Sequence, residues 1–241
     1  MKDKLKHLIV GYGEVGRGLA KVLKQRSNVW ILDPYNGHKH NNDWPKKFYA
    51  VHICFIYNSK FLKAVQDIKR RYKHNILIIH STVPIGTSDK LGAVHSPIRG
   101  THPKLAKGIK TFVKYVGGKK AIKAAKLLNR YGIKTKILRN ARDSEALKLW
   151  DTTQYAWMII LNKEIGKWCK KNKVDFDIIY RDANETYNAG YAKLGKRNVI
   201  RPILKYMPGK IGGHCVMPNC ELLDSSVSKL IKKINKNYRG E

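Results

Sequence analysis

Residues 7–16 read His-Leu-Ile-Val-Gly-Tyr-Gly-Glu-Val-Gly, a short apolar run that ends in three spaced glycines. Apolar residues at helical spacing follow between Arg17 and Lys24, and a second apolar run at 29–32 ends at Asp33. The order is therefore strand, glycine turn, helix, strand and acid. This order is typical of the first unit of a parallel sheet that carries helices on both faces.

The three glycines have the spacing that a dinucleotide requires. Gly11 makes the tight turn, Gly13 lets a pyrophosphate approach the backbone, and Gly16 lets the helix pack on the strand. Glu14 and Val15 begin the helix, where unpaired N–H groups and a partial positive charge face the phosphates. The motif predicts a dinucleotide site at this turn.

The acid after the second strand indicates which dinucleotide is bound. Asp33 lies twenty residues after Gly13, where a carboxylate can accept both hydroxyls of an adenosine ribose. The same carboxylate would repel a 2′-phosphate, so NAD is favoured over NADP. Lys39 and His40 lie close by in the sequence and leave NADP as the alternative.

Apolar runs and amphipathic stretches alternate as far as residue 138. Further strands are expected at 49–57, 75–80, 91–95, 111–116 and 134–138, with helices at 61–72 and 119–131 and a polar loop at 36–47. Strands that alternate with helices predict an α/β fold with a doubly wound parallel sheet. Residues 1–140 are therefore expected to form an NAD-binding Rossmann domain.

The pattern changes to long helices in the second part of the chain. Residues 144–150 read Ser-Glu-Ala-Leu-Lys-Leu-Trp and begin a stretch with few breakers before Asn172. This stretch predicts one central helix of roughly thirty residues. Shorter helices are expected at 176–187 and 220–238, so that residues 141–241 form a smaller helical domain for dimerisation and substrate binding.

A glycine-rich turn in this second domain ends in a cysteine. Residues 208–215 read Pro-Gly-Lys-Ile-Gly-Gly-His-Cys. Glycines permit positive φ angles and a close approach of the backbone to a ligand. A thiol on such a turn can attack a carbonyl carbon bound against it. The alternative is a surface turn with an incidental cysteine, because a lone cysteine is more often structural than reactive.

The cysteines also indicate whether a metal site is expected and which cellular compartment is favoured. Cys54, Cys169, Cys215 and Cys220 have no metal-type spacing, so no metal site is expected. Cys54 falls in a predicted buried strand and is expected to be inert. Free thiols favour a reducing cytoplasm. No signal peptide is expected before the first strand, and no apolar stretch approaches the length of about 18 residues that suggests a membrane span.

The net charge of +32 is unevenly distributed. Residues 90–142 carry fifteen Lys or Arg and no acid, and residues 186–220 also lack acids. Such a positive field attracts anions, so we expect an anionic small-molecule substrate, and nucleic acid is a further possible partner. No nucleic-acid-binding motif accompanies the charge. A lysine-rich composition with solvated side chains is the alternative explanation.

Four stretches together resemble the UDP-glucose/GDP-mannose 6-dehydrogenase family, over about residues 5–220. They are GYGEVG at 11–16, STVPIGT at 81–87, SEALKLW at 144–150 with Asn-Lys-Glu at 162–164, and PGKIGGHC at 208–215. The second and fourth stretches are specific to that family, whereas many dehydrogenases share the glycine motif.

The resemblance implies an enzyme that oxidises the 6-hydroxyl of a nucleotide sugar twice, with two NAD molecules. Cys215 would attack the intermediate aldehyde, and the ammonium group of Lys148 would stabilise the developing oxyanion. Ser81 and Thr82 would contact the cofactor, with Thr82 near the nicotinamide and the catalytic water. The long helix would build a homodimer, and its tryptophan-rich face suits such an interface.

Several residues depart from the family pattern. Thr152 stands where the family has asparagine, and Asn219 stands where it has aspartate; both remain catalytic candidates. Ile98 replaces a catalytic glutamate, and Lys163 replaces an asparagine. Family members also continue into a further α/β domain that grips the nucleotide, which this chain is expected to lack.

Three functions follow from these observations. The first is an NAD-dependent dehydrogenase related to the nucleotide-sugar enzymes, with Cys215 and Lys148 functional. The second is a single-step hydroxyacid-type dehydrogenase, in which Lys148 is the acid/base and Cys215 lines the pocket. The third is a non-catalytic descendant that senses NAD or binds nucleic acid. We prefer the first, because the four stretches follow one another in the family's order.

Overall fold

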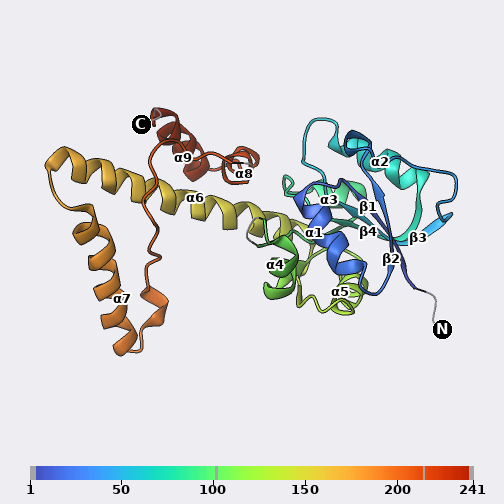
Figure 1. Ribbon diagram of the computed structural model, residues 1–241, viewed down its shortest axis with the longest axis horizontal. Coiled ribbons are helices and arrows are strands. Elements are labelled where there is room, and N and C mark those ends of the chain that lie inside the picture. The colour runs from blue at the N-terminus through green and yellow to red at the C-terminus, as the bar shows by residue number, and fades with distance from the viewer. Residues whose placement is uncertain (1–3, 101–102, 214, 239–241) are drawn as a thin grey trace. The chain divides into compact units, whose positions relative to one another are not determined.

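The computed structural model describes residues 4–100, 103–213 and 215–238 (Figure 1). It divides into two compact units, Met1–Lys148 and Leu149–Glu241. Helix α6 (Ala141–Asn172) contributes residues to both. The predicted boundary at residue 140 coincides with the start of α6, whereas the units divide a few residues later, inside this helix. Among the described residues, no helix is long and apolar enough to cross a bilayer.

Five parallel strands form the sheet of the first unit, in the order β2-β1-β3-β4-β5. They are β1 (Lys6–Val10), β2 (Asn28–Leu32), β3 (Lys47–Ile53), β4 (Lys73–Ile79) and β5 (Val94–His95). The chain moves from β1 outward to β2, then passes β1 again to reach β3 on its other side. The order therefore reverses between β1 and β3, and ligands of such sheets bind at the carboxyl ends of the strands at this point.

Helices cover both faces of this sheet (Figure 1). They are α1 (Glu14–Leu23), α2 (Phe61–Arg71), α3 (Thr87–Leu91), α4 (Leu105–Thr111) and α5 (Ala121–Asn129). Ile9 of β1 packs in a core with α1, α4 and α5, whereas Leu8 and Val10 pack in a second core with α2 and α3. Because both faces are covered, the buried strand positions are mainly apolar on both sides of the sheet. The predicted doubly wound α/β fold is confirmed.

A second, two-stranded parallel sheet consists of β6 (Lys114–Val116) and β7 (Thr135–Ile137). Gly117 and His95 exchange two backbone hydrogen bonds in an antiparallel bridge, with N···O distances of 2.9 and 3.0 Å. Because β6 runs against β5 at this bridge, its first residue lies beyond the carboxyl end of β5. Lys114 is thereby brought to the ligand-binding edge of the main sheet.

Three predicted strand boundaries in the first unit are wrong. The strand expected to reach residue 57 ends at Ile53, because its partners β1 and β4 end opposite it, at Val10 and Ile79. Helices α3 and α4 take Leu91 and Thr111 from predicted strands. With five and seven residues, these helices are too short to show a helical period in the sequence.

The second unit is helical and has a small core of its own. After α6 come a π-helical turn (Asp177–Asp182), α7 (Ala183–Lys193), α8 (Val216–Leu222) and α9 (Ser226–Asn237), while short 3₁₀ turns occupy Pro34–Asn36 and Arg197–Val199. Ala156, Ile160, Cys220 and Ile231 form the core. The 32 residues of α6 confirm the predicted long helix.

The single helix predicted at 220–238 is wrong. The backbone of Ser225 is extended, and its side-chain oxygen accepts a hydrogen bond from Ser228 N. In turn, the side-chain oxygen of Ser228 accepts a hydrogen bond from Ser225 N. This reciprocal capping box starts a new helix, so the apolar pattern is divided between α8 and α9. The segment predicted as a helix at 176–187 is indeed helical, but it begins with the π-helical turn and continues to Lys193.

Candidate active site

The glycine turn lies at the carboxyl end of β1 and leads into α1. Gly11 has a φ angle of +89°, and a Cβ on Gly16 would lie 2.0 Å from the carbonyl oxygen of Gly11, so both positions require glycine. Gly13 precedes α1 without a side-chain cap, and a Cβ there would meet no atom within 4 Å. Open space therefore borders the first turn of α1 at Glu14 and Val15, an arrangement that favours the binding of a phosphate group.

Asp33 follows β2 and is tied to the glycine turn. Its Oδ2 accepts hydrogen bonds from Tyr12 N (2.7 Å) and from Asn36 Nδ2 (2.8 Å), and its Oδ1 accepts one from Asn36 N (3.2 Å). Burial raises the pKa of this carboxyl, but the hydrogen bonds outweigh burial and leave the pKa below its usual value. A ribose diol that uses both oxygens would have to displace the Asn36 amide from Oδ2.

The STVPIGT stretch follows β4 at the same edge of the sheet. The hydroxyl of Ser81 donates to the carbonyl of Phe55, just beyond the end of β3 (2.5 Å), and the Ser81 carbonyl accepts from His95 Nε2 (3.1 Å). Thr82 is half-buried beside it. The predicted cofactor residues of both stretches thus follow strands β1 and β4 of one sheet, at its carboxyl edge.

Glu145 of α6 holds the end of this stretch, a contact that sequence reasoning did not identify. Its side chain is fully buried and accepts hydrogen bonds from Gly86 N (2.5 Å) and Ser88 N (2.7 Å). Burial raises the pKa of this carboxyl, and the hydrogen bonds only partly oppose the rise. The acid in SEALKLW was the sequence feature that could have indicated this contact, because it is the residue that binds the backbone at the end of STVPIGT.

Lys148 lies one turn further along α6, half-buried, in strongly basic surroundings. Burial lowers the pKa of His95 to about 3 and that of Lys114 to about 7, and the positive charge of Lys148 contributes to both shifts. Lys148 therefore lies within electrostatic reach of both groups near the carboxyl end of β5. The positive charge of its ammonium group can stabilise negative charge on a bound group.

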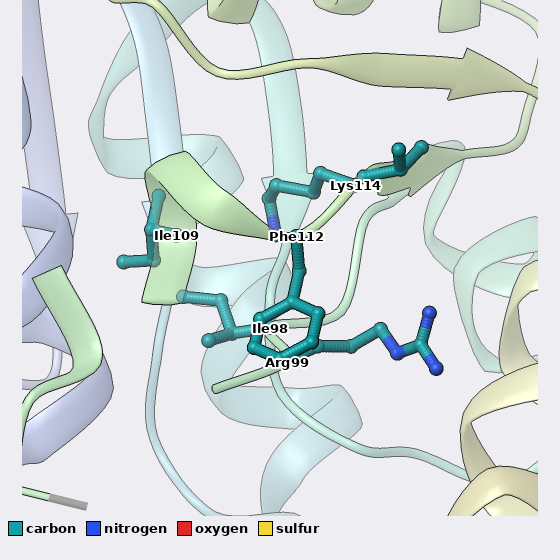
Figure 2. Close-up of a pocket in the computed structure, with 6 residues that line it drawn as sticks. Ile98, Arg99, Ile109, Phe112 and Lys114 are labelled. Carbon is teal, nitrogen blue, oxygen red and sulfur yellow. The ribbon is translucent and has the colours of Figure 1, made fainter. Parts of the chain in front are cut away.

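Lys114 is deeply buried, with 4% of its surface exposed. Its Nζ donates to the carbonyls of Ser96 and Pro97, the latter at 2.9 Å. Ile98 is also buried and, with Arg99 and Lys114, lines a cavity of about 10 Å³ (Figure 2). This volume suits one water molecule, not a substrate.

A row of three buried histidines crosses the sheet to this point. His7 Nδ1 lies 2.9 Å from His52 Nε2, and His52 Nδ1 lies 2.9 Å from His80 Nε2. The row ends at the Ser96 carbonyl, 2.8 Å from His80 Nδ1, and begins at the Tyr131 hydroxyl, 2.8 Å from His7 Nε2. Because a carbonyl can only accept, each histidine in the row donates from Nδ1 and accepts at Nε2.

The histidine row is neutral at pH 7. Burial lowers the pKa of His7 to about 4 and holds the pKa values of His52 and His80 well below 6.5. Sequence reasoning missed this row, although one histidine lies in or directly after each of three predicted strands. The three histidines lie side by side only because β1, β3 and β4 are adjacent in the sheet, and the sequence pattern does not give that order.

Cys215 belongs to the second unit, where it is exposed and directly precedes α8. One turn later, Asn219 N donates to the Cys215 carbonyl (3.3 Å), and Asn219 Nδ2 donates to Thr152 Oγ1 of α6 (3.3 Å). Two of the positions that depart from the family pattern therefore contact each other. His214, beside the cysteine, lies outside the described residues.

The catalytic candidates are distributed over both units. Thr82 and Lys148 belong to the first unit, and Cys215, Thr152 and Asn219 belong to the second. That these side chains come together in one site remains a prediction. In the described part of the chain, no group of three or more His, Cys, Asp or Glu side chains could hold a metal ion.

No protein-family model and no curated protein matches the sequence. Solved structures do match it. UDP-D-ManNAc dehydrogenase from Pyrococcus horikoshii has a TM-score of 0.74 at 18% identity, covering 97% of this chain and 69% of that one. UDP-N-acetyl-mannosamine dehydrogenase from Staphylococcus aureus has a TM-score of 0.72 at 20% identity, covering 97% and 68%.

A shorter dehydrogenase matches along almost its whole length. For 3-hydroxyisobutyrate dehydrogenase from Mycobacterium tuberculosis the TM-score is 0.66 at 13% identity, and the match covers 98% of this chain and 95% of that one. The chain shares the fold of these three enzymes. At these identities the likeness shows the fold alone.

Proposed function

We propose that this protein is an NAD-dependent dehydrogenase that oxidises the CH–OH group of an anionic substrate, related to the nucleotide-sugar 6-dehydrogenases. The observation that carries the proposal is the uncapped glycine turn at the point where the strand order reverses, with Gly13 beside open space. NAD bound there would accept a hydride from the substrate. Asp33 would bind its ribose, and Ser81 and Thr82 would lie near its nicotinamide.

The proposed chemistry uses one thiol and one ammonium group. The substrate alcohol loses a hydride and a proton to become an aldehyde, and Cys215 Sγ adds to the aldehyde carbon. A second NAD would accept a hydride from this adduct, which also loses a proton and becomes a thioester, and water hydrolyses the thioester to a carboxylate and the free thiol. Lys148 would stabilise the oxyanion in these steps.

The altered residues bear on the last of these steps. Thr152 and Asn219 form a neutral pair that can orient a water molecule, but neither side chain can take its proton at neutral pH. Ile98 likewise offers no carboxylate. The site therefore supports the first, two-electron oxidation better than thioester hydrolysis.

We propose a nucleotide sugar as the substrate, because two of the similar structures are dehydrogenases of UDP-linked sugars. The strongly basic composition suits a phosphate-bearing molecule. We also propose a homodimer through α6, on which Trp150, Trp157 and Trp168 are 45%, 37% and 56% exposed. Exposed aromatic side chains of this kind are typical of interfaces.

A hydroxyacid-type dehydrogenase is the second candidate, and one observation favours it. The fold match extends over 95% of the hydroxyisobutyrate dehydrogenase, so this chain has a counterpart for nearly all of that enzyme. In this alternative Lys148 is the acid/base and Cys215 only lines the pocket.

NADH formation distinguishes the candidates. Purified protein is mixed with NAD and with UDP-sugars, GDP-sugars or small hydroxy acids, and NADH absorbance is followed. Turnover of a nucleotide sugar that Cys215→Ala stalls at or before the aldehyde supports the first candidate. Turnover of a hydroxy acid that survives Cys215→Ala but not Lys148→Ala supports the second. NAD binding without turnover, together with tight nucleic-acid binding at physiological salt, would contradict both.

A further inference from the structure

The segment that leads to the cysteine turn is held from α6 by polar side chains. Asn162 Nδ2 donates to the carbonyl of Leu204 (3.2 Å). The next residue, Lys163, donates from Nζ to the carbonyls of Met207 and Gly209, the latter at 2.8 Å. Both side chains are 2% exposed, so water does not compete for these bonds.

Helix α9 holds the same segment from the other side. Asn235 Oδ1 accepts from Ile211 N (2.7 Å), and Asn235 Nδ2 donates to Ile211 O (3.2 Å). The amide thus satisfies both backbone groups of one residue. The side chain of Ile211 packs against the small core of this unit, and so does Val216, which follows the cysteine. Both sides of the turn are therefore anchored in the same core.

Glycine at position 166 has a packing reason. A Cβ there would lie 2.4 Å from the ring of Tyr206, which rests on α6 between the bonds made by Asn162 and Lys163. Glycine inside a helix costs roughly 0.5–1 kcal/mol relative to alanine. Gly166 is therefore explained by the close approach of the segment 204–211 to α6.

We propose that Asn162, Lys163, Gly166 and Asn235 form a clamp that fixes the backbone of residues 204–211 and thereby aims the thiol of Cys215. This loop clamp rests on the proposed role of Cys215 as the nucleophile. Lys163 is its central positioning residue, because one ammonium group with three donors can bind two carbonyls at once.

The surroundings of Lys163 agree with this role. Burial lowers the pKa of its ammonium group, and the ring of Tyr238 lies 5.5 Å from Nζ. The related family has an asparagine here, and an amide offers only two donors. The lysine is a feature of this chain and not a residue carried over from the family pattern.

The clamp is tested by the reactivity of Cys215 in the native protein. Cys54, Cys169 and Cys220 are 8%, 1% and 0% exposed, so alkylation by iodoacetamide without denaturant reports on Cys215, and fragment mass spectrometry verifies the site. Lys163→Met removes the donors at nearly constant volume. We expect alkylation to become about tenfold faster, because bonds from a charged donor no longer hold the turn in one conformation. Lys163→Arg should restore much of the wild-type rate.

Measurements of kcat and KM distinguish a positioning role of Lys163 from a merely structural one. With the substrate that the NADH screen identifies, Lys163→Met should lower kcat about 100-fold while KM changes little, because a misplaced nucleophile loses rate and not binding. Lys167→Met, an exposed lysine one turn along the same helix, is the matched control and should change neither alkylation nor kcat.

Wild-type alkylation in Lys163→Met overturns the clamp, and faster alkylation with unchanged kcat overturns its role in aiming the thiol. If Lys163→Met does not fold, Asn235→Ala decides by the same two measurements, since it removes the bonds from α9. Alkylation needs no substrate, so the clamp can be confirmed or refuted even if the proposed dehydrogenase activity fails.

Discussion

The glycine turn of the first unit and the cysteine turn of the second are both rich in glycine, but different forces shape them. At the glycine turn, Gly11 and Gly16 approach so closely that the backbone itself leaves no room for a side chain. At the cysteine turn, Gly212 and Gly213 have no atoms within 4 Å of a Cβ position. That turn depends instead on Lys163 and distant Asn235. Local sterics determine the first turn, and long-range hydrogen bonds determine the second.

The largest expected effect comes from removing the close approach in the first turn. Gly16→Ala places a Cβ against the carbonyl oxygen of Gly11, and neither backbone can move without displacing β1 or α1. We expect a loss of about 4 kcal/mol or more in the free energy of unfolding, measured by urea denaturation. Gly13→Ala is the matched control, because its Cβ meets open space: stability should hold while NAD affinity falls. Equal loss of stability in both variants would contradict the steric account.

The second prediction uses pH to weaken the first unit selectively. Folding lowers the pKa of His7 from 6.5 to about 4, so the unfolded chain binds more protons within this range. The resulting stability is complete above pH 6.5 and is lost as the pH falls toward 4, by about 3 kcal/mol for His7 alone. His52 and His80 act in the same direction.

Urea denaturation at pH 7 and pH 5 measures this loss. Amide hydrogen exchange at both pH values, corrected for the intrinsic rate, should show that β1, β3 and β4 lose protection before α8 and α9 do. His52→Leu should lower stability at pH 7, because it leaves ring nitrogens of His7 and His80 unpaired, but it should also reduce the loss on acidification. Equal loss of protection in both units would argue against the histidine row as the cause.

A smaller effect is expected where a side chain can yield. Gly166→Ala brings a Cβ to 2.4 Å from the ring of Tyr206, but a ring can shift more easily than a backbone carbonyl. We expect a net loss of about 2 kcal/mol, because the better helix propensity of alanine offsets part of the clash. Thermal melting measures it. Gly190→Ala is the control on α7, since its Cβ would meet nothing within 4 Å and should stabilise the protein slightly.

The smallest expected effect concerns the ribose contact. Asp33→Asn keeps the size of the side chain but removes its charge, and we expect NAD to bind about tenfold more weakly, as for loss of a charged hydrogen-bond acceptor. Calorimetric titration with NAD measures the change. Asn36→Ala removes the amide that shares Oδ2 and should leave affinity equal or improve it. Unchanged affinity in Asp33→Asn would refute the assignment of the ribose contact.

How much the sequence predicts varies along the chain. The central sheet, α1 and the 32-residue α6 follow from periodicity and glycine spacing, because each repeats over enough residues to be recognised. Helices α3 and α4 are too short for this. The boundary between α8 and α9 depends on one capping box, centred on Ser225, inside a continuous amphipathic pattern.

The candidate site shows the same division. The glycine turn, Asp33, Thr82 and Cys215 were recognisable as motifs, because each is encoded in a few consecutive residues. The contacts of Glu145, Lys163 and Asn235 were not, because their partners lie from 24 to 59 residues away in the sequence.

The sequence by itself determined the α/β class, the strand–turn–helix that suits a dinucleotide, and the residue types available for chemistry. These are local properties of backbone sterics and of hydrophobic period. Only the tertiary structure decided that three histidines join in one hydrogen-bonded row, that Thr152 meets Asn219, and that Lys163 holds the approach to the cysteine turn. The physical reason is that a hydrogen bond between distant residues depends on which surfaces the fold brings together, and no local pattern records that choice.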